Sequence, residues 1–149
     1  MKDTCVAILA GQGPEQAKLK KLASAKDIDE QVHFIGVQSD VRPALSAMDI
    51  FVLPSKAIET FSNAALEAMS MSRAVVLSEI GGAAEMVKDG QSGILFGVGD
   101  IDALTGVLTS LFDSSDMRER LGIAGRESVI ATFSRENMVE NYRKLTHSV

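Results

Sequence analysis

Short apolar runs alternate along the chain with longer segments in which apolar residues recur every three or four positions. The runs fall at residues 6–9, 32–35, 50–53, 74–77 and 93–96. Each run is nearly continuous in apolar residues, which is typical of parallel strands that helices cover on both faces. The pattern therefore predicts an α/β fold with a doubly wound parallel sheet of about five strands.

Turn-forming residues follow each predicted strand, which supports this division of the chain. They are Gly11-Gln12-Gly13-Pro14, Gly36, Pro54, Gly81-Gly82 and Gly97. From Asp100 onward the pattern is helical, and Ser134 is expected to cap the last helix. We expect a single domain, residues 1–149, with extra helices in its C-terminal third.

Composition and charge narrow the classes of function. The chain has 149 residues and a formal net charge of −5, whereas a nucleic-acid face needs many Lys and Arg to replace phosphate counterions. Cys5 is the single cysteine, so no intramolecular disulfide can form, and no zinc-site spacing occurs. The longest apolar runs are far shorter than the ~20 residues that span a bilayer. We expect a cytoplasmic protein that does not bind DNA or RNA.

The segment 62–71 predicts a site. It reads as a helix that is apolar or small almost all round, with Glu67 as its only charge, so we expect a buried helix in which Glu67 needs a partner. With Ser62 or Asn63 as the cap, Glu59 lies just before the helix and Glu67 about 6–7 Å along it. A helix N-terminus attracts anions. A phosphate between two hydroxyl-binding carboxylates indicates a nucleotide sugar.

This pair of acids resembles the Glu-x7-Glu motif of the retaining glycosyltransferases of family 4 (glycosyl transferases group 1), whose GT-B architecture has two Rossmann-like domains. Further stretches resemble other motifs of the family, in the same order over nearly the whole chain. They are Gly-x-Gly-Pro-Glu at 11–15, Val-x-Phe-x-Gly at 32–36, Val-Val-x-Ser-x-x-Gly-Gly-x-x-Glu at 75–85 and Asp-Gly-x-x-Gly at 89–93. The chain is therefore similar to the C-terminal, donor-binding domain of these enzymes.

The resemblance implies a role for each matching residue. Glu67 would bind the ribose hydroxyls and Glu59, the candidate catalytic residue, the hydroxyls of the transferred sugar. The backbone amides of residues 61–64 would hold the diphosphate, and the base would lie against the loop after Gly36. The expected donor-binding residues are Gly11, Gly13, Gly36, Val37, Thr60, Phe61, Ser62, Asn63, Ala64, Leu66 and Glu67. No cofactor or metal is implied, UDP-sugar is the default donor, and GDP- and ADP-sugars stay open.

The chain departs from the family in two places. Ser72-Arg73-Ala74 stands where the family favours Gly-x-Pro. The family's first strand and helix, which supply an Arg and a Lys that clamp the diphosphate, precede the segment matching residues 6–9, and the N-terminal domain binds the acceptor. We therefore expect a fragment that is inactive alone. Its acceptor would be a lipid-linked sugar, a polysaccharide or a small molecule, and membrane association of the full enzyme stays open.

The missing first strand would lie between the strands at residues 6–9 and 50–53. Its loss leaves two apolar strand edges without a neighbour. Because exposed edges recruit partners, we expect self-association through them.

Other classes fit the sequence less well. A dinucleotide fingerprint would need Gly where Gln16 stands. A flavodoxin-like regulatory module of the receiver type would need acids at the ends of its early strands, where this chain has Ala10-Gly11 and Pro54-Ser55. A sugar-nucleotide epimerase or a phosphorylase of the same architecture stays open as an alternative.

Overall fold

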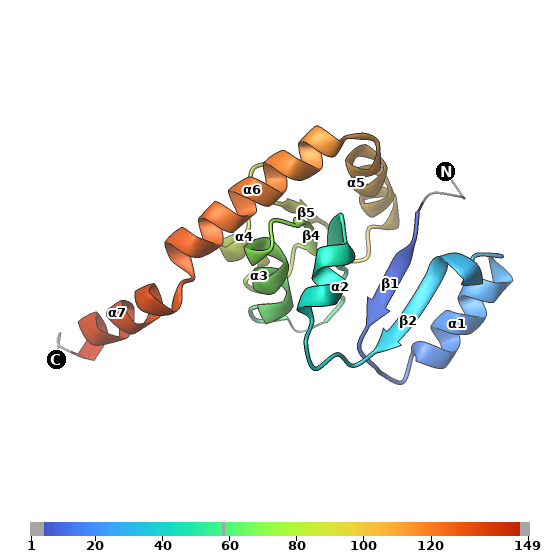
Figure 1. The fold of residues 1–149 in the computed structure, drawn as a ribbon, viewed down its shortest axis with the longest axis horizontal. Helices are drawn as coiled ribbons and strands as arrows, with labels where there is room; N and C mark the ends of the chain where they lie inside the picture. Colours follow the sequence, from blue (N-terminus) through green and yellow to red (C-terminus); the bar gives the residue numbers. More distant parts are fainter. Residues whose placement is uncertain (1–4, 58, 147–149) are drawn as a thin grey trace. The chain divides into compact units, whose positions relative to one another are not determined.

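The computed structural model describes residues 5–57 and 59–146, which contain parallel strands covered by helices (Figure 1). The described residues group into two compact units, one up to Ala44 and the other from Leu45 onward. The strands are β1 (Ala7–Ala10), β2 (Val32–Gly36), β3 (Ile50–Leu53), β4 (Ala74–Ser78) and β5 (Ile94–Phe96). The helices are α1 (Gln16–Ala25), the 3₁₀ helix η1 (Asp29–Gln31), α2 (Arg42–Ala47), α3 (Asn63–Ser70), α4 (Ala83–Met86), α5 (Ile101–Asp113), α6 (Ser115–Thr132) and α7 (Arg135–Thr146). All five predicted strands are confirmed to within one residue at either end.

The first unit is a two-stranded parallel sheet with α1. β1 and β2 pair from Ala7 opposite Val32 onward, with an irregularity after Leu9. Ala23 is the buried residue of α1. The Lys20 ammonium lies 5.4 Å from the centre of the Phe34 ring, which joins α1 to β2 through a cation–π contact.

The second unit is built on a three-stranded parallel sheet in the order β3-β4-β5. β4 is the central strand, and all five of its residues are buried. Its register places Ala74 opposite Ile50, and Val76 opposite both Val52 and Ile94. A strand that is paired on both edges and covered on both faces has no side exposed to solvent. Its residues are therefore apolar in succession and do not alternate with polar ones.

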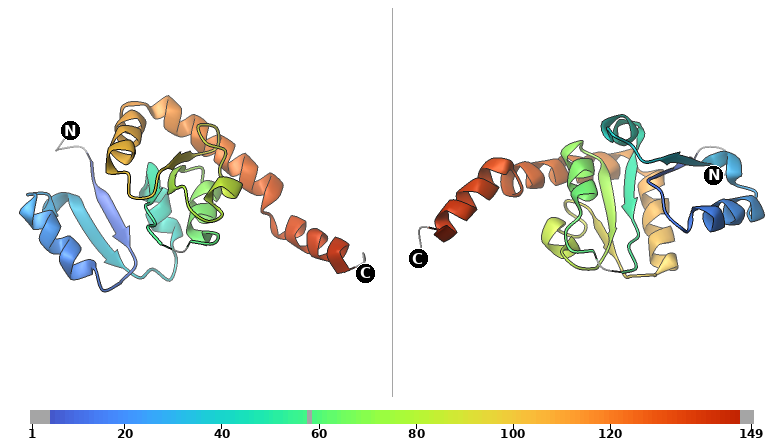
Figure 2. Two further views of the ribbon diagram at one scale, coloured as in Figure 1. Left: turned by 180° about the vertical axis from the view of Figure 1, so that it is seen from behind. Right: turned by 90° about the horizontal axis from the view of Figure 1, so that it is seen from below.

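Successive residues of β4 point to opposite faces of this sheet. Ala74 and Val76 pack against Leu111 of α5 and Leu121 of α6. Leu77, on the other face, lines a cavity together with Met86 of α4. Figures 1 and 2 show α5 followed directly by α6 beside the three strands. The predicted double cover of the strands is therefore confirmed for this unit.

Four described helix starts in this unit carry side-chain caps, the first of them Ser62 at α3. Asp100 caps α5 and Ser114 caps α6. The predicted cap of the last helix is also confirmed, because Asn137 N donates to Ser134 Oγ at 3.2 Å. α7 itself has no buried residue. Among the described residues, no helix is both long enough and apolar enough to cross a bilayer.

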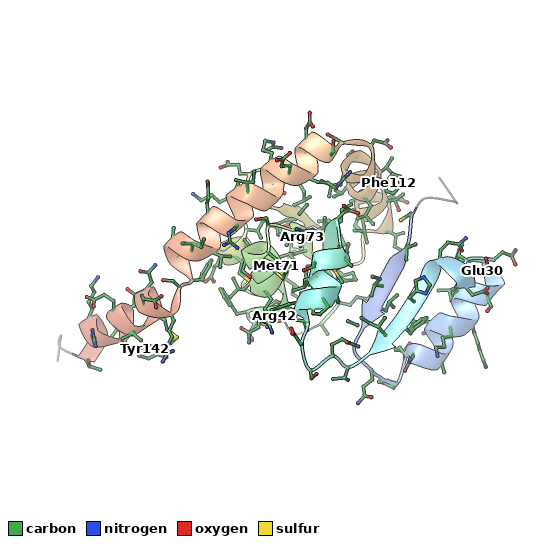
Figure 3. All side chains as sticks on the ribbon, viewed as in Figure 1. Glu30, Arg42, Met71, Arg73, Phe112 and Tyr142 are labelled. Carbon is green, nitrogen blue, oxygen red and sulfur yellow. The ribbon has the colours of Figure 1, made fainter. Side chains whose placement is uncertain are left out.

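The turn before β4 contains the departure from the family pattern. Ser72 adopts a φ of +56°, a left-handed conformation that Gly adopts more readily. The following Arg73 donates to the carbonyl oxygens of Met48, at 2.7 Å, and Met71, at 2.9 Å (Figure 3). The guanidinium thus joins the chain before β3 to the chain before β4, and the turn forms without the family's Gly and Pro.

The two edges expected to lack a neighbour do so in the structure. Within the described residues, β1 pairs only with β2, and β3 pairs only with β4. β3 is wholly apolar and half-buried, with neither a proline nor a charge inside it. Such features leave the backbone of an edge strand open to further pairing.

Candidate functional site

The loop after β3 leads into α3, and this junction forms the centre of the site. Ser62 is buried, and its hydroxyl accepts a hydrogen bond from Ala65 N at 3.2 Å. In an α-helix the amides of the first turn have no carbonyl one turn earlier to donate to. The cap uses one of these amides, and the N–H groups of Asn63 and Ala64 lie at exposed positions beside it.

α3 has one buried face and one exposed face. Ala65, Ala68 and Met69 are fully buried, whereas Asn63, Ala64 and Glu67 are exposed. Asn63 and Ala64 lie four and three positions before Glu67, and therefore share a face with it. Glu67 thus lies on the same side of the helix as the exposed residues Asn63 and Ala64 of its first turn.

The predicted burial of Glu67 was wrong. Its side chain is exposed, and no hydrogen bond or ion pair to it occurs within the part of the chain that the structure describes. Small residues give this segment its low charge without being buried, since Ala64 is exposed as well as Glu67. The carboxylate therefore needs no internal partner and is accessible to a ligand.

Glu59 is held differently, within a small cavity at the carboxyl ends of β3 and β4. Glu59 is half-buried, and Ser55 Oγ donates a long hydrogen bond of 3.5 Å to its Oε2 atom. The cavity is lined by Leu53, Ser55, Glu59, Ser62, Leu77, Ser78, Ile80, Ala83 and Met86. Ligands of open parallel sheets bind at this end of the strands. The structure thus brings Glu59 and the cap of α3 together at one cavity.

The backbone around Glu59 fits closely against the glycine pair after β4. Gly82 N donates to Thr60 O at 2.8 Å. A Cβ atom on Gly81 would lie 1.6 Å from the carbonyl oxygen of Glu59, and one on Gly82 would lie 2.5 Å from that of Thr60. Side chains at these two positions would displace the segment that holds Glu59.

The other end of α3 is also held. The Arg126 guanidinium of α6 donates to the carbonyl oxygen of Ser70, the last residue of α3, and a cation there complements the helix dipole. Gly122 and Gly125 allow α6 to lie close to the backbone at Ser72 and Ser92. Cβ atoms at these two glycines would approach Ser72 O to 2.2 Å and Ser92 O to 2.9 Å. Phe61, just before α3, contacts Phe133 edge to face, with 5.3 Å between ring centres.

Four predicted donor-binding residues belong to the first unit. Gly11 N donates to Gly36 O at 2.7 Å, so the ends of β1 and β2 meet there. Both glycines have positive φ values, and Cβ atoms on Gly11, Gly13 and Gly36 would meet no atom within 4 Å. Val37 is exposed. The structure therefore leaves open surface at these positions, and their contact with a donor stays a prediction.

The loop after Val37 contains an ion pair. Arg42 donates twice to the Asp40 carboxylate, at 2.8 Å each (Arg42 is labelled in Figure 3). These hydrogen bonds lower the pKa of Asp40 to about 2. The carboxylate is therefore ionised across the physiological range of pH.

Among the polar residues that line the cavity, sequence reasoning missed Ser55 and Ser78. For Ser78, a serine at the end of an otherwise apolar strand was the sequence feature that could have drawn attention to it.

In residues 5–57 and 59–146 no group of three or more His, Cys, Asp and Glu side chains could hold a metal ion.

Comparison with known proteins identifies the family. The family model described as "Glycosyl transferases group 1" matches residues 1–128. The chain belongs to the glycosyl transferases group 1 family. A curated relative, the lipopolysaccharide core biosynthesis glycosyltransferase LpsE of Rhizobium meliloti, is 32% identical over 140 residues, which are 94% of this chain and 41% of the relative. This group 1 chain thus spans about two fifths of that relative's length. The match does not support the regulatory-module alternative.

Solved structures place the chain in the C-terminal half of the GT-B architecture. Anabaena Alr3699/HepE in complex with UDP superposes with a TM-score of 0.90 at 23% identity, over 99% of this chain and 42% of that one. The C-terminal domain of LpcC, a group 1 glycosyltransferase of Francisella tularensis, superposes with a TM-score of 0.79 at 25% identity, over 87% and 70%. The predicted fold class is therefore confirmed for this group 1 domain.

Proposed function

We propose that this domain binds the nucleotide-diphosphate sugar of a retaining, metal-independent glycosyltransferase. The observation that carries the proposal is the capped N-terminus of α3, with half-buried Glu59 before it and exposed Glu67 on the same face as the exposed Asn63 and Ala64 of its first turn. UDP-sugar is the default donor, and the complex of HepE with UDP supports this choice. GDP- and ADP-sugars stay alternatives.

Each part of the site has a proposed role in holding the donor. The carboxylate of Glu67 accepts hydrogen bonds from the ribose hydroxyls, and Glu59 binds hydroxyls of the transferred sugar. Amides of residues 61–64 hold the diphosphate, where unpaired N–H groups and the helix dipole favour negative charge. Thr60 and Leu66 flank these contacts. In the other unit, Gly11, Gly13, Gly36 and Val37 are proposed to contact the donor.

The proposed reaction breaks the bond between the anomeric carbon and the diphosphate oxygen and forms a bond from that carbon to the oxygen of an acceptor hydroxyl, which loses its proton. Negative charge develops on the departing diphosphate. Amide donors fixed at the start of α3 stabilise this charge more in the transition state than in the ground state, which lowers the barrier. We propose that the acceptor binds residues beyond this domain, which is therefore inactive alone.

Titration of the full-length protein with UDP, GDP, ADP and the corresponding sugar nucleotides tests donor binding. We expect one diphosphate to bind in the absence of added metal and its sugar nucleotide to bind more tightly. No binding of any nucleotide would contradict the proposal.

Product analysis by NMR distinguishes the alternatives. A transferase yields a glycoside of retained configuration, an epimerase an isomeric sugar nucleotide, and a phosphorylase a sugar phosphate.

Replacing Glu59 by Gln separates the sugar contact from the nucleotide contact. Loss of a charged hydrogen bond to a sugar hydroxyl is expected to weaken sugar-nucleotide binding by about 1.5–3 kcal/mol. Affinity for the bare diphosphate is expected to stay unchanged. Calorimetric titration with both ligands measures the two effects. Equal weakening of both would show that Glu59 acts on the nucleotide or on the fold instead.

We also propose that the edges of β1 and β3 mediate self-association of this 149-residue chain. β3 supports this, since its free edge is apolar and uncharged and such edges add strands from other molecules. Light scattering is expected to show a mass that rises with protein concentration. Val52→Lys, a charge in the middle of β3, is expected to shift the chain toward the monomer. A concentration-independent monomer would contradict the proposal.

A further inference from the structure

The C-terminal half of α6 contacts the α3 segment at both ends. The Arg126 guanidinium donates to the carbonyl oxygen of Ser70, the last residue of α3. The ring of Phe133, which follows α6, meets the ring of Phe61, two residues before α3 begins. Seven residues of helix rise about 10.5 Å, and the eight residues of α3 rise about 12 Å. The two contacts are therefore spaced to hold both ends of α3 at once.

The ring of Phe61 is fixed by contacts at the surface and not by deep burial, since 37% of the residue is exposed. Its centre lies 5.3 Å from that of the Phe133 ring, and the two planes meet at 63°. Aromatic rings attract each other in this edge-to-face arrangement. A Cβ atom on Gly82 would lie 2.9 Å from Phe61 Cδ2, so the glycine leaves room for the ring. Phe133 and Gly82 thus define where the Phe61 ring lies.

Phe133 is itself held in place at the junction of α6 and α7. Its backbone N–H donates to Val129 O at 2.8 Å. On the α7 side, Asn137 N donates to Ser134 Oγ at 3.2 Å, and Asn137 Nδ2 donates to Ala131 O at 2.5 Å. The ring is therefore carried by backbone that is tied to both helices, and it gives Phe61 a fixed support.

We propose that Phe133 is a positioning residue for the diphosphate, which acts by holding Phe61. The proposal rests on the proposed donor binding and adds to it a residue from the end of another helix. Phe61 is the first residue of the segment 61–64, whose amides are proposed to hold the diphosphate. An N–H donor bonds well only within a narrow range of distance and angle. Support of the Phe61 ring from α6 keeps these donors directed at the phosphate oxygens, and Phe133 need not touch the ligand.

Ring variants of the full-length protein test the proposal by calorimetric titration. The probe is whichever of UDP, GDP and ADP binds wild type most tightly. Phe133→Leu removes the ring and is expected to weaken binding of this diphosphate about three- to tenfold. The sugar nucleotide is expected to lose the same factor, because its diphosphate binds the same amides. Phe133→Tyr keeps the ring and is expected to bind within about twofold of wild type.

A double-mutant cycle shows whether the effect passes through Phe61. Phe61→Leu is expected to weaken diphosphate binding by a similar factor, and the double variant no more than either single one. Phe112→Leu is the matched control, because Phe112 is a half-buried phenylalanine of α5, on which no part of the proposed site lies. This control is expected to lower stability in urea, as Phe133→Leu does, and to leave diphosphate affinity unchanged.

Three results would overturn the proposal. Unchanged diphosphate affinity in Phe133→Leu would show that the ring pair only stabilises the fold. Additive losses in the double variant would show that Phe133 does not act through Phe61, and weak binding by Phe133→Tyr would show that the ring is not what matters. Phe133→Met replaces Phe133→Leu in these comparisons if the leucine variant does not fold. If wild type binds no diphosphate, the proposed donor binding itself fails, and this result is distinct from the others.

Discussion

Nucleotide affinity is expected to fall by about 1–3 kcal/mol when Glu67 is replaced by Ala, which is roughly 5- to 150-fold in the dissociation constant. The reason is the loss of charged hydrogen bonds to the ribose hydroxyls. Because Glu67 is exposed and makes no side-chain hydrogen bond in the described structure, the substitution is expected to change the free energy of unfolding by less than about 0.5 kcal/mol. Calorimetric titration with the bound diphosphate and urea denaturation measure the two quantities.

Glu119 provides the control for Glu67. It is also an exposed glutamate within a helix, α6, on which no part of the proposed site lies. Glu119→Ala is expected to leave both nucleotide affinity and stability unchanged. If Glu67→Ala binds the diphosphate as tightly as this control does, Glu67 is not a ribose ligand.

Replacing Gly81 by Ala is expected to destabilise the protein by about 3–4 kcal/mol. Gly81 has a φ of +56°, and an added Cβ would lie 1.6 Å from the carbonyl oxygen of Glu59. The left-handed conformation accounts for about 1–2 kcal/mol of the loss. The remainder comes from displacing the backbone of the Glu59 segment, so sugar-nucleotide binding is expected to weaken as well. Urea denaturation and titration measure the two losses.

Gly90 isolates the conformational part of this effect. Its φ is +70°, and an added Cβ would meet nothing within 4 Å. Gly90→Ala therefore incurs the conformational cost alone, about 1–2 kcal/mol, and leaves sugar-nucleotide binding unchanged. Equal destabilisation by the two substitutions would show that the segment around Glu59 yields freely and is not held by the glycine pair.

The strands could be predicted from the sequence because each one is marked twice, by an apolar run and by the turn residue after it. β3 was predicted to the residue, and β4 to within one residue. The sequence did not predict which strands pair with each other. The division of the strands between β1-β2 and β3-β4-β5 depends on backbone hydrogen bonds, and the apolar side chains of a strand do not indicate its partner.

The sequence indicated candidate residues of the site but did not indicate correctly how deeply each is buried. The spacing of Glu59, Ser62 and Glu67 around a helix start was visible in the sequence, and of the two expected caps, Ser62 and Asn63, the structure selects Ser62. The burial of Glu67 was predicted wrongly, because small residues around a helix allow close packing without requiring it. Only Ala65, Ala68 and Met69 define the buried face.

Contacts between distant segments were beyond the reach of sequence reasoning. The approach of Gly81 and Gly82 to residues 59–60 and the ring contact between Phe61 and Phe133 depend on ångström-scale distances between separate segments. Sequence periodicity predicts the elements but not those distances.

The fixation of α3 has a consequence for binding energetics. The Ser62 hydroxyl holds its first turn, and the Arg126 guanidinium holds its last residue. The amides proposed to receive the diphosphate are therefore preorganised, and a ligand does not have to order the backbone on arrival. Since ordering entropy otherwise subtracts from affinity, even a modest set of contacts at this helix end can give measurable binding.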